Sequence, residues 1–538
     1  MTTNRRTLRR AALAVAVPFG CALALANCDD DFLDTQPLGS LTGSTFYQTE
    51  QDFDAATLGP YSTMLNLTFD QNGLGWWNGF LLPDDDVRFR DPNNANDFFN
   101  WNANNGDFAW VWQQSYLGIM RANVVLEQLP LAANFSDEAN KPRYEAEARY
   151  MRAYWYFILA RNWGDVPIIT EVVSSVEAAQ APNSASGEVW DLIEEDLEFA
   201  AANLPEAFPN EVGRATRYTA LALLGKVELY RAQWFDSPAK YGEAIEHLEQ
   251  VVSSGRFSLM PDYGDNFRES AENNAESLFE VQATAGDNVN AWGTTDTGGA
   301  AGHAWTIYVS PSCYYGPNGG CAPQAWGHGY GQIEFTQSLI DEFEEGDPRF
   351  YYTAYSTGEP YAWEQYNMEG GQFRLWSGTG HTPAKYNRPF DPNRFPNNLS
   401  TNNLRIIRYA DVLLMLAEAE LLGNNNVARA TELVNQVRAR ARQTYQILNG
   451  SPAPADVVPD RAAVTIDDIA HERRVELASE VHRYDDLVRW HRAGLIDIAT
   501  DITWGYPDND NWTETHLLKP IPQGELQINP NLQQNPGY

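Results

Sequence analysis

The 538-residue chain has little positive charge, with 37 Lys and Arg against 72 Asp and Glu, and a formal net charge of −35. A negative field of this size repels phosphate backbones, so nucleic acid is not expected as a partner. Only 5 of the basic residues are Lys. Aromatic residues are abundant instead, with 17 Trp, 26 Tyr and 24 Phe, and a hydrophobic content of 43% excludes a wholly disordered chain.

Long apolar runs are missing except at the N-terminus. Four Arg within residues 5–10 precede an apolar stretch over residues 11–26, which is shorter than the ~20 residues that span a bilayer. Residues 1–27 are therefore predicted to be a secretory signal peptide. The end of this segment, Leu-Ala-Asn-Cys, resembles a bacterial lipobox, although Asn27 stands where Gly, Ala or Ser is usual. We expect Cys28 to carry the lipid and to provide the only attachment to the membrane.

Cysteine is scarce as well, with 4 residues in the whole chain. Export places the chain in an oxidising space, Cys21 is lost with the predicted signal peptide, and acylation consumes Cys28, which leaves Cys313 and Cys321. These two bracket a turn-forming segment rich in Gly, Pro and Asn that begins with Tyr314 and Tyr315. We predict a disulfide between Cys313 and Cys321. It either holds the two tyrosines in one pose for a ligand or only stabilises an exposed loop.

Apolar residues at helical spacing predict a mainly α protein. The predicted helices are Val111–Leu129, Ser136–Asn162, Val189–Asn203, Thr219–Trp234, Lys240–Ser253, Arg408–Leu422, Val427–Arg442 and Asp467–Arg492. Between Asp262 and Asn403, Gly, Asn, Pro and aromatic residues crowd together, and only Ile333–Phe343 has a helical pattern. We expect a helical region over 28–260, a loop-rich region over 261–405 and a second helical region over 406–538, in one compact unit. A long irregular region is typical of a functional surface.

Two segments approximate the tetratricopeptide repeat. Leu224, Gly225, Tyr230, Tyr241, Ala244 and Ile245 fall in two predicted helices joined by a short turn, and Ala417, Ala419, Gly423 and Ala430 form a looser second copy. In such repeats Gly allows paired helices to approach closely. The pattern predicts a helical-repeat scaffold.

Charged residues are dense in the segment Glu472–Arg489, where Asp485 and Arg489 have the spacing of a helical ion pair. Two of these carboxylates could act as the acid and base of a hydrolase. With so many Arg counterions, a buried or half-buried charge lattice that ties helices together is favoured.

No metal site or other cofactor is predicted. Asp84, Asp85 and Asp86, followed by Asp91, Asn93, Asn94, Asn96 and Asp97, offer hard oxygen donors for a structural calcium ion, but their spacing is not that of an EF-hand. A solvated acidic loop is the favoured interpretation. The eight His are scattered, and the His-Glu-x-x-His spacing of zinc hydrolases is absent.

Aromatic clusters in irregular sequence are the candidate ligand-binding residues. Sugar rings present flat C–H faces that stack on exposed aromatic side chains, while neighbouring Asn, Asp, Gln or Arg bind the hydroxyl groups. The candidates are Trp76, Trp77, Trp101, Trp292, Trp305, Tyr314, Tyr315 and Trp326. The alternative for any one of them is that the ring fills a gap in the core.

Several longer segments resemble the SusD/RagB family of outer-membrane nutrient-binding lipoproteins, the starch-binding SusD-like proteins. They are CDDDFLDTQP after the signal, AEARYMRAYWYFILARNWGDVPIIT (146–170), RATRYTALALLGKVELYRAQW (214–234), RYADVLLMLAEAE (408–420), HERRVELASEVHRYDDLVRW (471–490) and LLKPIPQGELQINPNLQQNPGY (517–538). They follow the order found in the family over nearly the whole chain after the signal.

The resemblance implies an α-helical fold with four tetratricopeptide-like units and a loop-rich remainder. It also implies a lipid-anchored protein, facing the cell surface, that binds oligosaccharides or other nutrients without cleaving them and caps a TonB-dependent, SusC-like transporter. The Asp-rich start of the exported chain resembles a surface-export signal of such lipoproteins. Two alternatives remain open: a secreted glycoside hydrolase, and a structural repeat protein with no small ligand.

Overall fold

The computed structural model describes residues 46–69, 80–90, 94–283, 331–356, 379–386, 401–504 and 511–538, with side chains omitted for 66–69. Within these ranges the chain is mainly helical, as predicted. No helix among them has both the length and the apolar character needed to cross a membrane.

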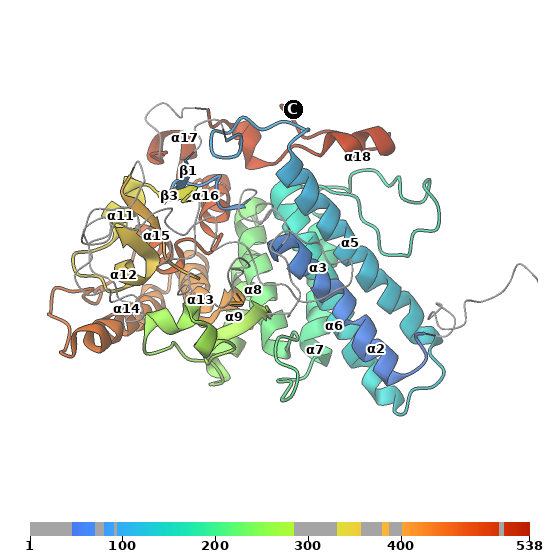
Figure 1. Ribbon diagram of the computed structural model, residues 1–538, viewed down its shortest axis with the longest axis horizontal. Helices are drawn as coiled ribbons and strands as arrows, with labels where there is room; N and C mark the ends of the chain where they lie inside the picture. The colour runs from blue at the N-terminus through green and yellow to red at the C-terminus, as the bar shows by residue number, and fades with distance from the viewer. Residues whose placement is uncertain are drawn as a thin grey trace, which may run out of the picture.

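Eight helices form a ladder in which each one packs against the next. They are α3 (Leu58–Phe69), α5 (Gly106–Gln128), α6 (Lys141–Trp163), α7 (Glu188–Asn203), α8 (Arg217–Trp234), α9 (Ala239–Ser253), α13 (Tyr409–Asn424) and α14 (Val427–Asn449). Figure 1 shows the ladder running from α3 and α5 on the right to α13 and α14 on the left. Its successive pairs α3–α5, α6–α7, α8–α9 and α13–α14 confirm the predicted repeat scaffold.

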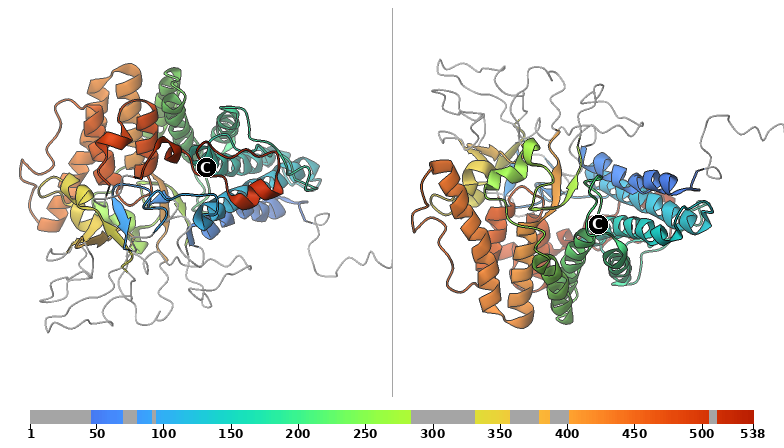
Figure 2. Two further views of the ribbon diagram at one scale, coloured as in Figure 1. Left: turned by 90° about the horizontal axis from the view of Figure 1, so that it is seen from above. Right: turned by 90° about the horizontal axis from the view of Figure 1, so that it is seen from below.

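Helices α9 and α13 are neighbours although residues 254–408 separate them in the sequence. Both views of Figure 2 show α8 and α9 in green beside α13 and α14 in orange. Residues 254–408 are therefore an insertion between the third and fourth helix pairs of one continuous ladder.

Two glycines allow the close helix contacts that the repeat pattern predicts. A Cβ atom on Gly225 of α8 would lie 2.6 Å from Leu248 Cγ and 3.3 Å from the Ala244 carbonyl oxygen, both on α9. A Cβ on Gly423 of α13 would lie 2.4 Å from the Cβ of Tyr241, also on α9. Real Cβ atoms do not approach so closely, so side chains at these positions would force the helices apart.

Among the described residues, three two-stranded antiparallel sheets lie in the inserted region and its surroundings. Strand β1 (Val87–Phe89) pairs with β3 (Ile333–Phe335), β2 (Ser277–Val281) with β6 (Leu404–Arg408), and β4 (Ala354–Ser356) with β5 (His381–Pro383). Strands β3 and β5 contact each other, so two of the sheets are joined.

The remaining described helices are short. The α-helices are α2 (Glu50–Ala56), α11 (Gln337–Glu342), α12 (Arg349–Thr353), α15 (Ile466–Leu477), α16 (Arg483–Arg492), α17 (Ile498–Asp501) and α18 (Gln523–Ile528). The 3₁₀ turns are η2 (Leu129–Leu131), η3 (Glu138–Asn140), η4 (Tyr263–Phe267), η5 (Glu269–Ala271) and η8 (Glu514–Leu517). Helix α18 lies near the start of α5 (Figure 1), and the Gln523 N–H donates to the Ala103 carbonyl oxygen at 2.7 Å.

The eight predicted helices are present, but two predictions of continuous helix are wrong. The predicted helix Asp467–Arg492 is divided into α15 and α16 by residues 478–482, where Ser479 and Val481 both have a φ of 65°. Left-handed φ at a β-branched residue costs energy, so the surroundings must hold this turn in place. The predicted helix Ile333–Phe343 begins as β3, because its first residues pair with β1, and only α11 is helical.

Candidate functional site

Most of the predicted ligand-binding and covalent-modification residues lie outside the described residues. These are Trp76, Trp77, Trp292, Trp305, Tyr314, Tyr315 and Trp326 among the aromatics, together with Cys28, Cys313 and Cys321. The structure does describe the strands and helices to which these segments are joined, and it describes Trp101.

Trp101 is a core residue, which does not fit the expectation of an exposed stacking surface. Its side chain is 7% exposed, and the indole N–H donates to the Asn96 carbonyl oxygen at 3.2 Å. Its ring packs edge-on against Phe108 and His516, with centroid distances of 5.2 and 5.0 Å. Trp101 fills a gap between the start of α5 and the C-terminal segment, which was the alternative left open by the sequence.

The strand pairs fix the described ends of the segments that contain the other candidates. The Arg90 N–H donates to the Gln332 carbonyl oxygen at 2.7 Å, which extends the β1–β3 pair by one residue before the start of β3. At the other end of residues 284–330, the Ala283 N–H donates to Asn403 Oδ1 at 2.7 Å, next to the β2–β6 pair. The described residues on both sides of residues 284–330 are therefore attached to hydrogen-bonded strands.

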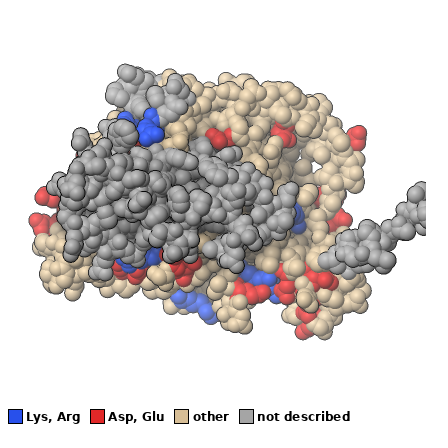
Figure 3. Space-filling model, in the orientation of Figure 1, with Lys and Arg blue, Asp and Glu red and all other residues tan. Residues whose placement is uncertain are grey.

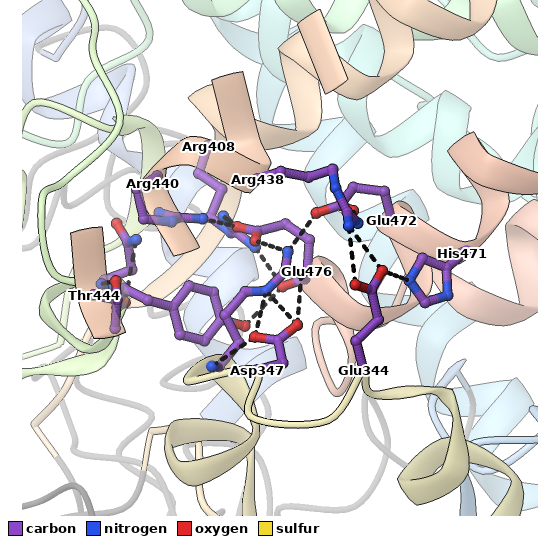
Figure 4. Close-up of polar contacts among 12 residues, drawn as sticks. Glu344, Asp347, Arg408, Arg438, Arg440, Thr444, His471, Glu472 and Glu476 are labelled. Carbon is purple, nitrogen blue, oxygen red and sulfur yellow. Dashed lines mark hydrogen bonds and ion pairs between the residues drawn. The ribbon is translucent and has the colours of Figure 1, made fainter. Parts of the chain in front are cut away.

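A network of buried ion pairs lies beneath these strands, centred on Glu476 of α15 (Figure 4). Its carboxylate accepts hydrogen bonds from Arg349 at 3.1 Å, from Arg408 at 2.6 Å and from Arg440. All four side chains are at most 2% exposed. Burial alone would raise the pKa of Glu476, but the Arg440, Arg408 and Arg349 guanidinium groups hold it well below its usual value.

Arg408 joins the network to both β6 and the turn between α15 and α16. As the last residue of β6 it contacts Glu276 at 2.8 Å, and its Nε lies 2.7 Å from Glu480 Oε2. Lys385, which follows β5, donates to Glu480 Oε1 at 2.8 Å and to the Glu476 carbonyl oxygen at 3.0 Å. Lys385 after β5 and Arg408 of β6 thus share the Glu480 carboxylate, and both also bind Glu476, Lys385 at the Glu476 carbonyl oxygen and Arg408 at the Glu476 carboxylate.

A second part of the network connects α15 with α14 and with the segment that precedes α12. Glu472 contacts Arg349 at 2.5 Å and Arg438 at 2.8 Å, and Arg438 also contacts Glu344 at 2.9 Å (Figure 4). His471 lies 3.3 Å from Glu344. Burial disfavours the charged form of His471, but hydrogen bonds to Glu342 and Glu344 outweigh it and raise its pKa to about 9.

The three consecutive aspartates after residue 83 are buried, so the expectation of a solvated loop is wrong for them. Asp85 contacts Arg483 at 2.7 Å and Arg474 at 2.9 Å, and Asp86 contacts Arg474 at 2.7 Å. Despite burial, Arg474 and Arg483 lower the pKa of Asp85 to about 2. Among the described residues no group of three or more His, Cys, Asp or Glu has an arrangement that could hold a metal ion.

The predicted helical ion pair between Asp485 and Arg489 is not formed. Asp485 pairs with Arg161 of α6, while Arg489 pairs with Asp486 at 2.8 Å and with Glu418 of α13. Tertiary partners on α6 and α13 thus replace the Asp485–Arg489 pair, while Arg489 keeps a local pair with Asp486, three residues before it. A buried charge needs hydrogen-bonding partners, and these tertiary contacts supply them.

The charged segment over 472–489 therefore forms the predicted charge lattice between helices. A general acid needs a carboxyl group that holds a proton near neutral pH and can reach substrate. Glu476, Glu480 and Asp486 are buried, and Arg neighbours lower the pKa of each carboxyl group. These carboxylates can hold strands and helices together, but they cannot protonate a substrate.

Charges on the surface are mixed. On the face shown in Figure 3, acidic and basic side chains of the described residues occur side by side along the lower edge. Ion pairs between partly exposed side chains of the described residues include Arg429–Glu249, at 2.9 Å, and Arg231–Asp191, at 2.8 Å.

The matches to known proteins span both helical regions. A model described as SusD family matches residues 275–538, and a model described as starch-binding, associating with the outer membrane, matches residues 86–229. A SusD-like protein of Bacteroides ovatus is 30% identical over 490 residues, covering 88% of this chain and 81% of that protein.

Two solved structures extend the likeness to the fold. A laminarin-binding SusD-like protein is 27% identical with a TM-score of 0.73, covering 91% of this chain and 100% of the other. Surface glycan-binding protein A from Bacteroides fluxus is 25% identical with a TM-score of 0.71, covering 91% and 100%.

Proposed function

The chain belongs to the SusD family of glycan-binding proteins, and from this premise we propose that it captures an oligosaccharide and delivers it to a TonB-dependent, SusC-like transporter. Association with the outer membrane is part of the family description. The observation that carries the proposal is the 27% identical laminarin-binding structure, which matches 91% of this chain. Laminarin is accordingly the first ligand to test.

The proposed stacking surface consists of aromatic residues from the early and middle segments, Trp76, Trp77, Trp292, Trp305, Tyr314, Tyr315 and Trp326. The β1–β3 pair supports this grouping, because it brings the chain that follows Trp77 and the chain that follows Trp326 into one sheet. A proposed disulfide between Cys313 and Cys321 would reduce the entropy lost by Tyr314 and Tyr315 on binding.

In the proposed function, the network of buried ion pairs holds rigid the strands and helices to which the aromatic segments are joined. Arg408 of β6 and the two aspartates Asp85 and Asp86 contact charged side chains of α15 or α16, and Lys385, which follows β5, contacts Glu480 in the turn between these helices. A binding surface loses less entropy when the elements that carry it are already fixed. We therefore assign to the ion pairs a supporting role, while contact with sugar belongs to the aromatic segments.

Calorimetric titration of laminarin oligosaccharides tests the proposal. We expect Tyr314→Ala, Tyr315→Ala and Trp326→Ala to weaken binding by about tenfold or more each, because an exposed ring that stacks on sugar contributes ~1.4 kcal/mol or more. Tyr445→Ala, a truncation on α14, is the matched control and should bind as the unmodified chain does. Unchanged affinity in all three variants would place the sugar site elsewhere.

The same samples separate binding from hydrolysis. We propose that the protein releases no new reducing ends from laminarin, starch or other glucans during prolonged incubation. Product formation that tracks the protein through purification would instead support the glycoside hydrolase. Failure to bind any polysaccharide of a broad panel, in the presence or absence of the transporter, would support a structural repeat protein.

Lipid attachment at Cys28 is part of the proposal and has its own test. Cys28→Ala should move the protein from the membrane fraction to the soluble fraction while its helical circular dichroism stays the same. Retention of this variant in membranes after a high-salt wash would contradict anchoring at Cys28. Protease treatment of intact cells then reports whether the anchored protein faces outward.

A further inference from the structure

A small pocket of about 50 Å³ lies between α6, α8, β6 and the turn at residues 478–482. This volume is far below the ~300 Å³ at which small-molecule sites begin, so the pocket is not a sugar site. One part of its wall is apolar, with Phe157, Ile158 and Leu223. The other part is polar and contains Arg161, Lys226, Arg405, Glu480 and His482.

Two of the lining arginines have hydrogen-bond donors left over. Arg161 and Arg405 side chains are 8% and 1% exposed, and the Nε of each has no hydrogen-bond partner among the described residues. Arg405 Nε lies 3.3 Å from Glu280 Oε1, but the geometry is not that of a hydrogen bond. A buried guanidinium N–H without an acceptor is costly, so an acceptor at this place would be bound favourably.

Lys226 adds a further donor. Its Nζ lies 3.1 Å from Asp411 Oδ2 and 3.3 Å from His482 Nδ1, which uses two of the three ammonium N–H groups. An ammonium group can only donate, so His482 Nδ1 accepts and the ring proton sits on Nε2. Burial and the nearby Lys226 charge lower the pKa of His482 to about 3, which keeps the ring in this neutral form.

Acceptors in the pocket wall are already engaged. Glu480 is the only acidic side chain among the described residues that line the pocket, and its Oε1 accepts from Lys385 and Arg408 while its Oε2 accepts from Arg408. Donors therefore outnumber free side-chain acceptors. A water molecule in such a place must still donate two hydrogen atoms, whereas an anion only accepts.

We infer that this pocket binds a monovalent anion of the size of chloride. The volume exceeds the ~10–15 Å³ that one water molecule requires by this measure, which leaves room for a larger single ion. Each of the three cations already has one carboxylate partner, Asp485 for Arg161, Asp411 for Lys226 and Glu280 for Arg405, so the remaining N–H donors rather than net charge favour the anion. In a low dielectric these donors bind an anion more strongly than they would in water. The ion would connect α6, α8, β6 and the strained turn that carries Val481.

Anomalous diffraction from crystals of the full chain grown in sodium bromide locates the ion directly. The expected result is one strong bromide peak within the pocket, in contact with Lys226 and at least one of the two arginines. A pocket that contains only water molecules, or bromide bound only at other places, would overturn the inference.

Thermal unfolding in solution provides the second measurement. A ligand that binds only the folded state raises the Tm, and for a chain of this length a ~100-fold excess over Kd gives about 2 °C. We expect this increase on exchanging gluconate for chloride at equal ionic strength in the unmodified chain. Equal Tm values in the two salts would argue against a bound anion.

Two lysine variants make the solution test specific. Lys226→Met removes a donor from the pocket but leaves Asp411 paired with Arg473 at 2.9 Å, and it should lose the chloride-dependent increase. Lys240→Met removes the same charge from a surface pair with Glu194 and should keep the increase. An equal chloride effect in both variants would show that the ion binds elsewhere. If Lys226→Met does not fold, the bromide peak in the unmodified chain decides.

Discussion

At Gly225, helix α8 contacts α9 through small and apolar side chains, with one charged pair, Glu228–His247, elsewhere along the two helices, whereas around Glu476 helix α15 contacts its neighbours through charged ones. At the first contact Gly225 faces Leu248 and Ala244, and all three are buried. At the second, Glu476 faces Arg408 and Arg440, which are buried just as completely. Both contacts fix helices in place, but they respond differently to substitution.

The stability of the apolar contact depends on side-chain volume, whereas the stability of the ionic contact depends on the presence of every charged partner. A closely packed helix pair tolerates changes that keep the volume and fails when atoms are added. A buried ionic group is satisfied only while every partner is present, because removing one leaves the others charged and desolvated. Close packing thus holds the helix ladder together, and buried ion pairs hold the region around Glu476 together.

The largest loss of stability is expected at the centre of the ion-pair network, at Glu476. Glu476→Gln keeps the shape of the side chain but leaves Arg349, Arg408 and Arg440 without their shared carboxylate, which should cost about 3–5 kcal/mol of unfolding free energy. Denaturant unfolding followed by circular dichroism measures the change. Arg429→Gln, which breaks a surface pair with Glu249, is the control and should cost about 0.2–1 kcal/mol. Similar costs in the two variants would mean that burial of the charges is not what matters.

A change of pH is expected to alter the stability contributed by His471, at the edge of the same ion-pair network. The pKa of His471 is raised to about 9 in the folded state, so its contribution to stability is complete below its unfolded value near 6.5 and is lost as the pH rises through 9. The stability difference between the unmodified chain and His471→Gln should fall by about 2–3 kcal/mol between these limits. Unfolding midpoints of both proteins across this pH range supply the measurement. A difference that stays constant would contradict a raised pKa of His471 beside Glu342 and Glu344.

The smallest of these effects is expected in the ladder. Gly225→Ala places a Cβ 2.6 Å from Leu248 Cγ, and the strain should exceed the gain in helix propensity by about 1–2 kcal/mol. Gly242→Ala on α9 is the matched control, because its Cβ would meet nothing within 4 Å and should stabilise the helix. Thermal unfolding of the two variants compares them directly. If both substitutions stabilise, the helices are not in close contact at Gly225.

Helix periodicity was enough to predict the ladder but not its boundaries with other elements. The pattern of α8 and α9 repeats within a short stretch of sequence, and local spacing therefore carries the information. Residues 478–482 have helical composition, yet they form a strained turn because Glu480 must reach Arg408 and Lys385 at once. The requirement comes from partners 72 and 95 residues away, which no local pattern contains.

The candidate site shows the same division. An aromatic residue in an Asn-rich segment has the same local sequence whether it stacks on a sugar or fills the core, and Trp101 fills the core. The aspartates at 84–86 have the composition of a surface loop, but all three are buried, and Arg474, 388 residues from Asp86, pairs with Asp85 and Asp86. Burial of a polar group is set by distant partners.

The sequence alone determined the class of fold, the order of the helices, the glycine positions where they cross and the family. These depend on spacing within a helix and on motifs a few residues long, and both are local properties of a chain. Only the tertiary structure decided which charges pair, where the insertion joins the ladder and which aromatic ring is buried. Those outcomes depend on whether residues far apart in the chain can together satisfy a desolvated group, and only the folded chain brings them within hydrogen-bonding distance.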